Sequence, residues 1–205
     1  GRAAELGGGV LGRFGWKAQI PSVDEFVRDA LTAELGMSLE PSAGLSFGFL
    51  QDDDGLADPE FGLEGEQILA DFLRELAPPP RQPPGDAAAA ARGEQLFATV
   101  GCATCHVPAL PGSFGPVALY SDLLLHDVLA EDARGVEEGV ATTREFRTAP
   151  LWGISRTAPY LHDGSADTLE QAILGHHAEA ARSRADFEVL SEREQADLLE
   201  FLSTL

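Results

Sequence analysis

The residues with the clearest chemistry in this sequence are its two cysteines, which lie three positions apart and directly precede a histidine. Residues 102–106 read CATCH. Two thiols at this spacing can add to the two vinyl groups of one haem, and the adjacent histidine then lies beneath the iron as its proximal ligand. The pattern therefore predicts one covalently attached haem c, held by Cys102 and Cys105 and ligated by His106.

Two other kinds of site could use such a cysteine pair. A zinc ion is usually held by four protein ligands, typically two such pairs, and the chain has no further cysteine, for which His176 and His177 are a poor substitute. A thioredoxin-like dithiol needs a βαβ context, which the sequence does not show. With two cysteines the chain also lacks the disulfide framework of small secreted domains. We therefore favour haem.

The second axial ligand is less obvious, because cytochromes with one haem commonly use a methionine that follows the motif. The only methionine of the chain, Met37, precedes it. The candidates after the motif are four histidines, with the tyrosines behind them: His126, His162, His176 and His177. His126 and His162 are each followed by an aspartate, which could orient the imidazole or simply form a turn with it.

Spacing favours His176 among these candidates. It lies seven residues after Leu169 and three after Ile173, so on a helix it would continue the buried stripe. A histidine on an apolar helix face is usually a core residue, but a ligand role is the better interpretation beside a haem that has no methionine available. If no histidine reaches the iron, the iron stays open and five-coordinate, as in a haem enzyme.

A proline-rich run at 78–85 divides the chain, because proline cannot continue a helix and favours an extended, semi-rigid connector. We expect a helical segment at 1–77 that packs on a cytochrome c domain at 86–205. No convincing strand is present. The predicted fold is therefore all-α, with helices and long irregular loops around one haem.

Capping residues mark most of the predicted helices. Ser22 begins a helix that ends near Leu35, and Asp86 begins one that ends near Thr99. Capping boxes begin two more, Asp167 with Glu170 and Ser191 with Glu194. The remaining helix, 63–76, carries an apolar face made of Ile68, Leu69, Phe72, Leu73 and Leu76. The helix that begins at Asp167 is expected to reach Ala181 and to contain His176.

An acidic run at 52–54, followed by Gly55, invites a calcium interpretation. It fails the EF-hand template, because Leu50 occupies a ligand position and Phe61 the closing position. A solvated acidic loop is the better interpretation.

The chain is strongly acidic, with a formal net charge of −20. This excludes nucleic acid as a partner and favours a basic redox protein, although acidity also serves solubility alone. No apolar run approaches the roughly 20 residues that span a bilayer, and the first residues lack the apolar region of a signal peptide. We expect a processed product, or a piece of a longer polypeptide, that works in the periplasm or otherwise outside the cytoplasm.

Several runs that follow the haem motif resemble the C-terminal haem domain of bacterial di-haem cytochrome c peroxidases. Residues 146–154 read FRTAPLWGI, 158–164 read APYLHDG and 168–173 read TLEQAI. Two further runs, GRFGWKA at 12–18 and YSDLLLHD at 120–127, are similar to the di-haem oxidoreductase branch, often labelled thiol-oxidoreductase-like. The resemblance covers nearly the whole chain.

The resemblance implies a distal ligand. In that superfamily it lies eight residues after the threonine of the T-L-E motif, and is methionine in the peroxidases and tyrosine in the methylamine-utilisation relative. Counting from Thr168 reaches His176, so the resemblance implies bis-histidine ligation by His106 and His176. Histidine in place of methionine usually lowers the potential. Trp16 would lie toward a second haem and assist electron transfer, or be an ordinary buried indole.

The family has two haems, whereas this chain has one CxxCH motif. The second haem domain would then lie elsewhere in a longer chain, in a separate partner, or be absent from a one-haem derivative. We expect electron transfer by a single haem, as the electron-transfer half of a di-haem oxidoreductase-like protein. The alternatives are a peroxidase-like haem enzyme, which needs a second haem domain or an open iron, and a structural or redox subunit of a larger respiratory or photosynthetic complex.

Overall fold

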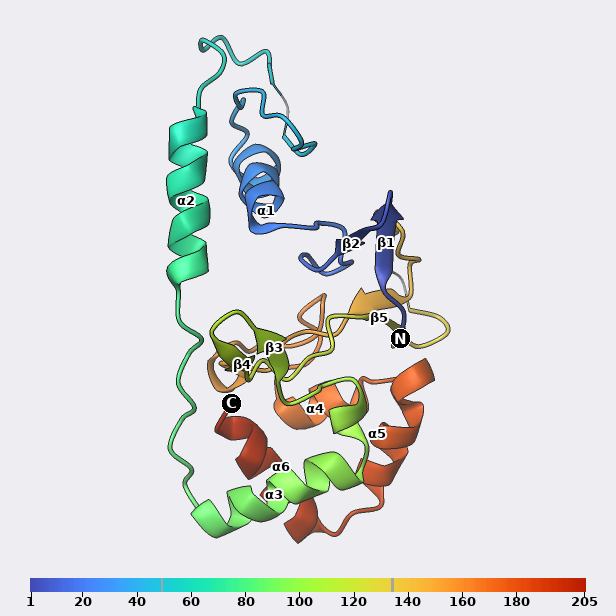
Figure 1. Ribbon diagram of the computed structural model, residues 1–205. Coiled ribbons are helices and arrows are strands. Elements are labelled where there is room, and N and C mark those ends of the chain that lie inside the picture. Colours follow the sequence, from blue (N-terminus) through green and yellow to red (C-terminus); the bar gives the residue numbers. More distant parts are fainter. Residues whose placement is uncertain (49, 134) are drawn as a thin grey trace.

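The computed structural model describes residues 1–48, 50–133 and 135–205. Its α-helices gather in two groups (Figure 1): α1 (Val23–Asp29) and α2 (Leu63–Glu75) at one end, and α3 (Ala87–Thr99), α4 (Leu169–Leu174), α5 (Ala181–Glu188) and α6 (Glu192–Ser203) at the other. The connector runs extended along one side, and short strands lie between the two groups. Within the described residues no helix has the length and apolar character needed to cross a membrane.

Side-chain caps begin the helices as the sequence predicts. The Ser22 hydroxyl accepts from the N–H of Glu25, and the Asp86 carboxylate accepts from the first turn of α3. Ser191 and Glu194 form the predicted capping box of α6. The predicted helix over 22–35 is present, but its second half, Ala30–Glu34, is a π-helix.

The N-terminal helices pack on each other around a small core. Arg28 of α1 and Glu66 of α2 form a buried ion pair between them. The apolar side chains around this pair are Val27, Leu31, Leu39 and Ala70. Because Glu66 and the small Ala70 face α1, the large apolar side chains of α2 point elsewhere.

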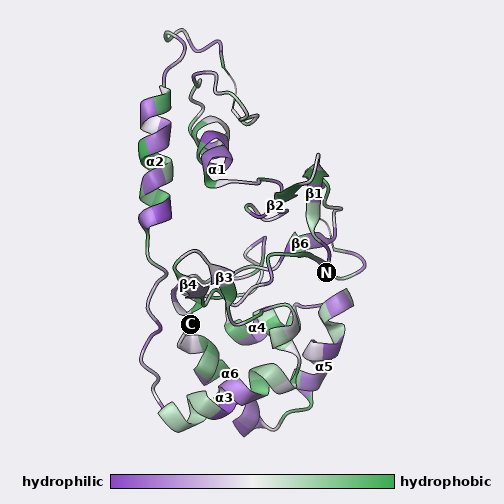
Figure 2. Cartoon of the chain, in the orientation of Figure 1, coloured by the Kyte–Doolittle hydropathy of each residue, from purple (hydrophilic) through white to green (hydrophobic). Residues whose placement is uncertain are grey.

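The predicted apolar face of α2 is largely exposed. Ile68, Phe72 and Leu76 are 62%, 60% and 54% exposed. Leu69 and Leu73 are also classed among the exposed large hydrophobic residues, and Figure 2 shows the apolar positions alternating with polar ones along this helix. A row of exposed apolar side chains of this size is unusual for a surface that faces only water.

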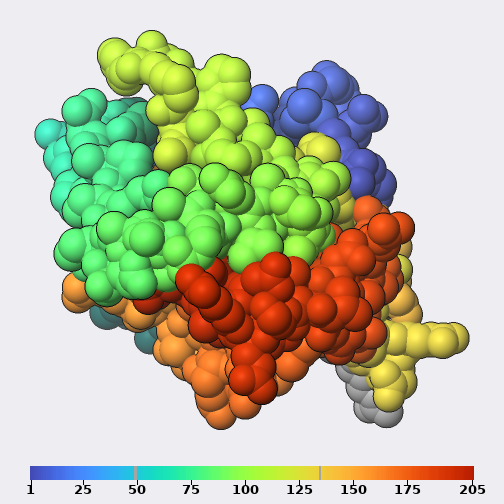
Figure 3. All heavy atoms as spheres, turned by 90° about the horizontal axis from the view of Figure 1, so that it is seen from below, coloured from blue at the N-terminus to red at the C-terminus, as the bar shows by residue number. Residues whose placement is uncertain are grey.

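The main core lies between α3 and α6, which pack side by side and are seen together from below in Figure 3. Gly93 permits this contact, because a Cβ atom there would lie 2.7 Å from the Cβ of Phe201 and closer still to the Asp197 carbonyl. Arg92 and Asp197 pair beside it at 2.6 Å. Around the contact lie Phe97, Val100, Tyr120, Phe187, Leu198, Phe201, Leu202 and Leu205.

The predicted helix over 167–181 is wrong in its extent. Its start is one residue later than expected, because the capping box joins Thr168 to Gln171. Helix α4 ends at Leu174, and the N–H of His177 leaves the helix to donate to the Val128 carbonyl at 3.0 Å. A 3₁₀ turn (Ala178–Ala180) then leads into α5. His176 therefore lies on the connection between two helices.

The all-α expectation is also wrong, because the described residues form three antiparallel strand pairs. They are β1 (Ala4–Gly7) with β2 (Val10–Gly12), β3 (Leu110–Gly112) with β4 (Gly115–Val117), and β5 (Leu125–Asp127) with β6 (Glu145–Arg147). Strands of three or four residues are too short to show the alternation of apolar and polar residues that predicts a strand. The pairing of β5 with β6 is also distant along the chain.

The proline-rich connector, 78–85, lies against the main core between α3 and α6. The N–H of Gln82 donates to the Thr204 carbonyl at 2.7 Å. The guanidinium of Arg81 lies over the rings of Phe201 and Tyr120, 5.2 and 5.8 Å from their centres. These cation–π contacts attach the connector to the main core.

Candidate haem site

The CATCH run follows α3 directly and forms one compact turn. Gly101 has a φ of 88°, in the left-handed region that glycine adopts without strain, so it ends the helix. Residues Cys102–Thr104 form a 3₁₀ turn, and the His106 N–H donates to the Cys102 carbonyl at 2.9 Å. Both cysteines are free thiols and partly buried. The packing of α3 on α6 thus fixes where this turn begins.

The cysteines do not have the character of a redox dithiol. Burial raises the pKa of the Cys102 thiol to about 11, whereas the attacking cysteine of a CxxC oxidoreductase has a lowered pKa. Cys102 packs against the main core, and the Cys105 Sγ lies 3.6 Å from the Nδ1 of His126. The dithiol alternative is therefore not supported by the surroundings of the pair.

The ring of His106 is held by the backbone of the loop that precedes β5. Its Nδ1 lies 3.0 Å from the Tyr120 carbonyl, so Nδ1 carries the proton and donates it. Burial lowers the pKa of His106 to about 4, which keeps the imidazole neutral. Proteins commonly orient a metal-ligating histidine by a hydrogen bond from the ring nitrogen that does not bind the metal. Here that nitrogen is Nδ1, and the Nε2 lone pair stays available.

His176 is held by a backbone carbonyl in the same way and faces His106. Its Nδ1 lies 2.7 Å from the Ala172 carbonyl, one turn back in α4, and burial lowers its pKa. The centres of the His106 and His176 rings are 6.5 Å apart, with an angle of 63° between the ring planes. The structure therefore brings together the four residues named for the haem by the sequence, and both imidazoles keep Nε2 free among the described contacts.

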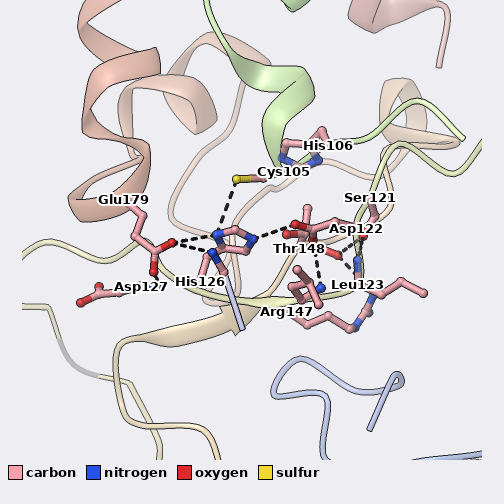
Figure 4. Close-up of polar contacts among 12 residues, drawn as sticks. Cys105, His106, Ser121, Asp122, Leu123, His126, Asp127, Arg147, Thr148 and Glu179 are labelled. Atoms are coloured by element: carbon pink, nitrogen blue, oxygen red, sulfur yellow. Dashed lines mark hydrogen bonds and ion pairs between the residues drawn. The ribbon is translucent and has the colours of Figure 1, made fainter. Parts of the chain in front are cut away.

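The remaining histidines have other surroundings. His126 lies between Asp122 and Glu179 and has both ring nitrogens engaged (Figure 4), and the hydrogen bond to Asp122 raises its pKa to about 10. His177 Nδ1 accepts from Arg184 at 3.0 Å. The ring of His162 stacks on Phe146, with 4.4 Å between the ring centres. A protonated imidazole has no lone pair for iron, so His126 does not suit a ligand role.

Trp16 is 52% exposed, so the interpretation of it as an ordinary buried indole is wrong. Its carbonyl accepts from the N–H of Arg147 at 2.8 Å. The next residue, Lys17, is 3% exposed and donates to the carbonyls of Thr142, Thr143 and Glu145. Its ammonium group lies 3.5 Å from the centre of the Phe146 ring. These contacts join the GRFGWKA and FRTAPLWGI runs, and they hold the indole at the surface.

Sequence reasoning missed the groups that orient the two imidazoles. They are the backbone carbonyls of Tyr120 and Ala172, and a carbonyl leaves no mark in a sequence. It also missed the roles of Asp122 and Glu179, although Asp122 lies within the YSDLLLHD run. Asp122 had a signal, since it lies four residues before His126 and is close enough along the chain to engage its ring; Glu179 is 53 residues away and had none.

The acidic loop at 52–54 uses its carboxylates on its own backbone. Asp52 accepts from the N–H of Asp54 at 3.2 Å, and Asp54 accepts from the N–H of Leu56 at 2.7 Å. Glu60 lies near these two carboxylates and accepts from the N–H of Ser38. Turns of this kind are built from aspartates without a metal.

The family model described as "Di-haem oxidoreductase, putative peroxidase" matches residues 3–205. Methylamine utilization protein MauG of Methylorubrum extorquens is 33% identical to the chain over 159 residues, which is 67% of this chain and 42% of that protein. The chain thus spans about two fifths of the length of this relative.

Two solved structures have a similar fold. One is a MauG-like protein associated with microbial copper homeostasis, with a TM-score of 0.58 and 20% identity, covering 99% of this chain and 72% of that chain. The other is hydrazine synthase of Kuenenia stuttgartiensis, with a TM-score of 0.52 and 25% identity, covering 73% of this chain and 57% of that chain. The likeness to the first extends over both helical groups and the connector.

Proposed function

This chain belongs to the di-haem oxidoreductase family, and from that premise we propose that it forms the electron-transfer half of such a protein. In this proposal one haem c is attached to Cys102 and Cys105 and ligated by His106 and His176. The family membership supports haem-based redox chemistry in general. The number of haems and their ligation are the parts that we infer from this chain's own residues.

The observation that carries the proposal is the spacing of the two imidazoles. A metal is bonded by histidine nitrogen at about 2 Å, and each ring centre lies about 1 Å behind that nitrogen. An iron held between two Nε2 atoms therefore requires ring centres about 6 Å apart, close to the observed 6.5 Å. The angle between the ring planes does not affect this fit, because two imidazoles on opposite sides of one iron can have their planes at any angle to each other.

When bound, the haem supplies an iron that takes up and releases one electron. The chain's own residues hold both imidazoles neutral and oriented, so that His106 and His176 could both ligate the iron. Phe97 and Tyr120 line the proximal side, with the Phe97 ring centre 6.5 Å from that of His106. Two basic nitrogen ligands stabilise the ferric state and lower the potential. An iron that has both imidazoles as ligands would suit electron transfer better than peroxide binding.

A partner that carries the second haem completes the proposal. The family is di-haem, while this chain has one CxxCH and spans a minority of the length of its MauG relative. The exposed apolar face of α2 and the exposed indole of Trp16 support a docked haem domain in that partner. The net charge of −20 favours a basic protein as a further redox partner. Covalent haem attachment supports a periplasmic or other extracytoplasmic location.

Visible spectra of the ferric and ferrous protein, with the intact mass, test the proposal. We expect a low-spin ferric spectrum, a mass increase of one haem that survives denaturation, and no spectral change with peroxide. A high-spin ferric spectrum, or a rapid reaction with peroxide, would refute it and favour the peroxidase-like enzyme. Stable co-purification with other cytochromes, together with a redox-silent haem, would favour a structural subunit of a larger complex.

A further inference from the structure

His126 of β5 is a buried cation between two carboxylates. Its residue is 5% exposed. The Nε2 of the ring lies 2.8 Å from Asp122, and Nδ1 lies 2.9 Å from Glu179 (Figure 4). Hydrogen bonds between charged groups are roughly twice as strong as those between neutral ones. A side chain held in this way on both sides acts as a fixed link between the two segments that carry the carboxylates.

The first of these segments holds the proximal ligand. Asp122 lies two residues after Tyr120, whose carbonyl accepts from His106. The backbone N–H of Asp122 donates to the Cys105 carbonyl at 2.9 Å. The segment that contains Asp122 is therefore hydrogen-bonded to the CATCH turn at Cys105 and at His106.

The second segment carries the distal histidine. Glu179 lies three residues after His176, on the irregular connection between α4 and α5, where Ala178 has a strained φ of 45°. Glu179 also accepts from the N–H of Asp127 at 3.0 Å and pairs with the N-terminal ammonium of Gly1 at 3.1 Å. The N–H of His177 donates to the carbonyl of Val128, the residue that follows β5. His176 itself is hydrogen-bonded to the last turn of α4 through the Ala172 carbonyl, while the segment that follows it is held by its contacts with β5 and Val128.

We propose that His126 is a positioning residue, which links the segment that holds His106 to the segment that carries His176 and so determines how readily His176 leaves the iron. The inference rests on the proposed bis-histidine ligation. Its functional meaning is that the link keeps the iron six-coordinate and closed to small ligands. His126 itself does not contact the iron.

Carbon monoxide binding to the ferrous haem protein tests this link, because carbon monoxide can bind only after the distal histidine leaves. Glu179→Ala removes the hydrogen bond between His126 and the segment that carries His176, and it leaves the His126–Asp122 pair intact. Glu179→Gln restores an oxygen that can accept from His126. Asp186→Ala is the matched control, since it removes a carboxylate of α5 whose partner is the surface residue Arg182. His126→Phe removes both hydrogen bonds and keeps a ring of similar shape.

We expect the binding rate of the wild-type protein to level off at high carbon monoxide concentration, at the rate at which His176 leaves. Glu179→Ala should raise this limiting rate about tenfold, because it removes the partly exposed carboxylate that accepts from His126 and from the Asp127 N–H and that pairs with the N-terminal ammonium of Gly1. His126→Phe should raise it further. Glu179→Gln should return toward the wild-type rate, and Asp186→Ala should match it.

Unchanged limiting rates in Glu179→Ala and His126→Phe, with covalent haem retained, would overturn the link while leaving bis-histidine ligation intact. If His126→Phe does not fold, the comparison of Glu179→Ala with Asp186→Ala decides the matter. A wild-type rate that keeps rising with carbon monoxide concentration, together with a high-spin spectrum, would overturn the distal ligation and this inference with it.

Discussion

Replacing Gly93 with alanine places two physical effects in opposition, and the structure decides which is larger. Gly93 is an interior residue of α3, where alanine is more favourable than glycine by about 1 kcal/mol on helix propensity alone. Its neighbour across the interface is α6, whose Phe201 Cβ would lie 2.7 Å from the new methyl group. Carbon atoms in contact prefer about 3.5–4.0 Å, so α6 would have to move by about 1 Å.

The steric cost should exceed the gain in propensity. Adding a methyl group to a well-packed core costs about 1–3 kcal/mol, and more where backbone must move. We therefore expect Gly93→Ala to lower the free energy of unfolding by about 1–2 kcal/mol net. For a chain of this length each kcal/mol corresponds to about 2–4 °C in Tm, so the Tm should fall by about 2–8 °C.

Thermal unfolding of the haem-loaded protein, followed by circular dichroism and by the haem Soret band, measures this change. Ala91→Gly, at an exposed position of the same helix, is the matched control and should lose about 1 kcal/mol from propensity alone. A Gly93→Ala protein that is as stable as the wild type, or more stable, would show that α3 and α6 do not approach as closely as described.

Three further predictions concern the site and the two helical groups. His176→Ala should convert the ferric haem to high spin, and added imidazole should restore low spin. The wild type should give an electron paramagnetic resonance spectrum typical of crossed imidazole planes, because the planes of its two rings are 63° apart. A visible spectrum of His176→Ala that is unchanged from the wild type would point to His177, His126 or His162 instead. The hydrogen bond and ion pair with Arg2 lower the pKa of Glu145 to about 2, below its value in the unfolded chain. Its contribution to stability is therefore present above about pH 5 and lost as the pH falls toward 2. Glu145→Gln should weaken the fall in Tm over this range, and an equal fall in Tm with pH in the variant and the wild type would contradict the assignment. Arg28→Met leaves Glu66 buried and unpaired and should lower the free energy of unfolding by about 3–5 kcal/mol, seen as faster hydrogen exchange in α1 and α2. Adding Glu66→Leu should recover most of this loss. Exchange that stays at the wild-type rate in Arg28→Met would mean that the pair is not buried.

The parts of the site that could be predicted from sequence are those encoded locally. The CATCH run specifies its chemistry within five residues, and Asp86 and Ser191 are recognisable caps because capping involves neighbours three positions away. The orienting carbonyls of His106 and His176 could not be predicted in this way. A backbone carbonyl is offered by every residue, and only the fold determines which one faces an imidazole.

The prediction of His176 was argued from a helix that does not extend to this residue. The helical spacing from Leu169 and Ile173 pointed to this residue, yet the helix ends before it, since the His177 N–H pairs with a carbonyl of a distant segment. Long-range pairing of the same kind forms the strands β5 and β6, which no local sequence pattern predicts. Tertiary contacts override local propensity most easily in short, irregular stretches, and most of this site is built from such stretches.

The contacts of the connector determine where the chain can be shortened. Arg81 covers the rings of Phe201 and Tyr120, and the backbone of Gln82 pairs with that of Thr204. A truncated protein that starts at Asp86 would keep α3 to α6 but would uncover both aromatic rings and leave a carbonyl of the last turn without its donor. One that starts at Pro78 retains these contacts. In limited proteolysis the prolines and this attachment should protect the run at 78–85, although most of its residues are exposed.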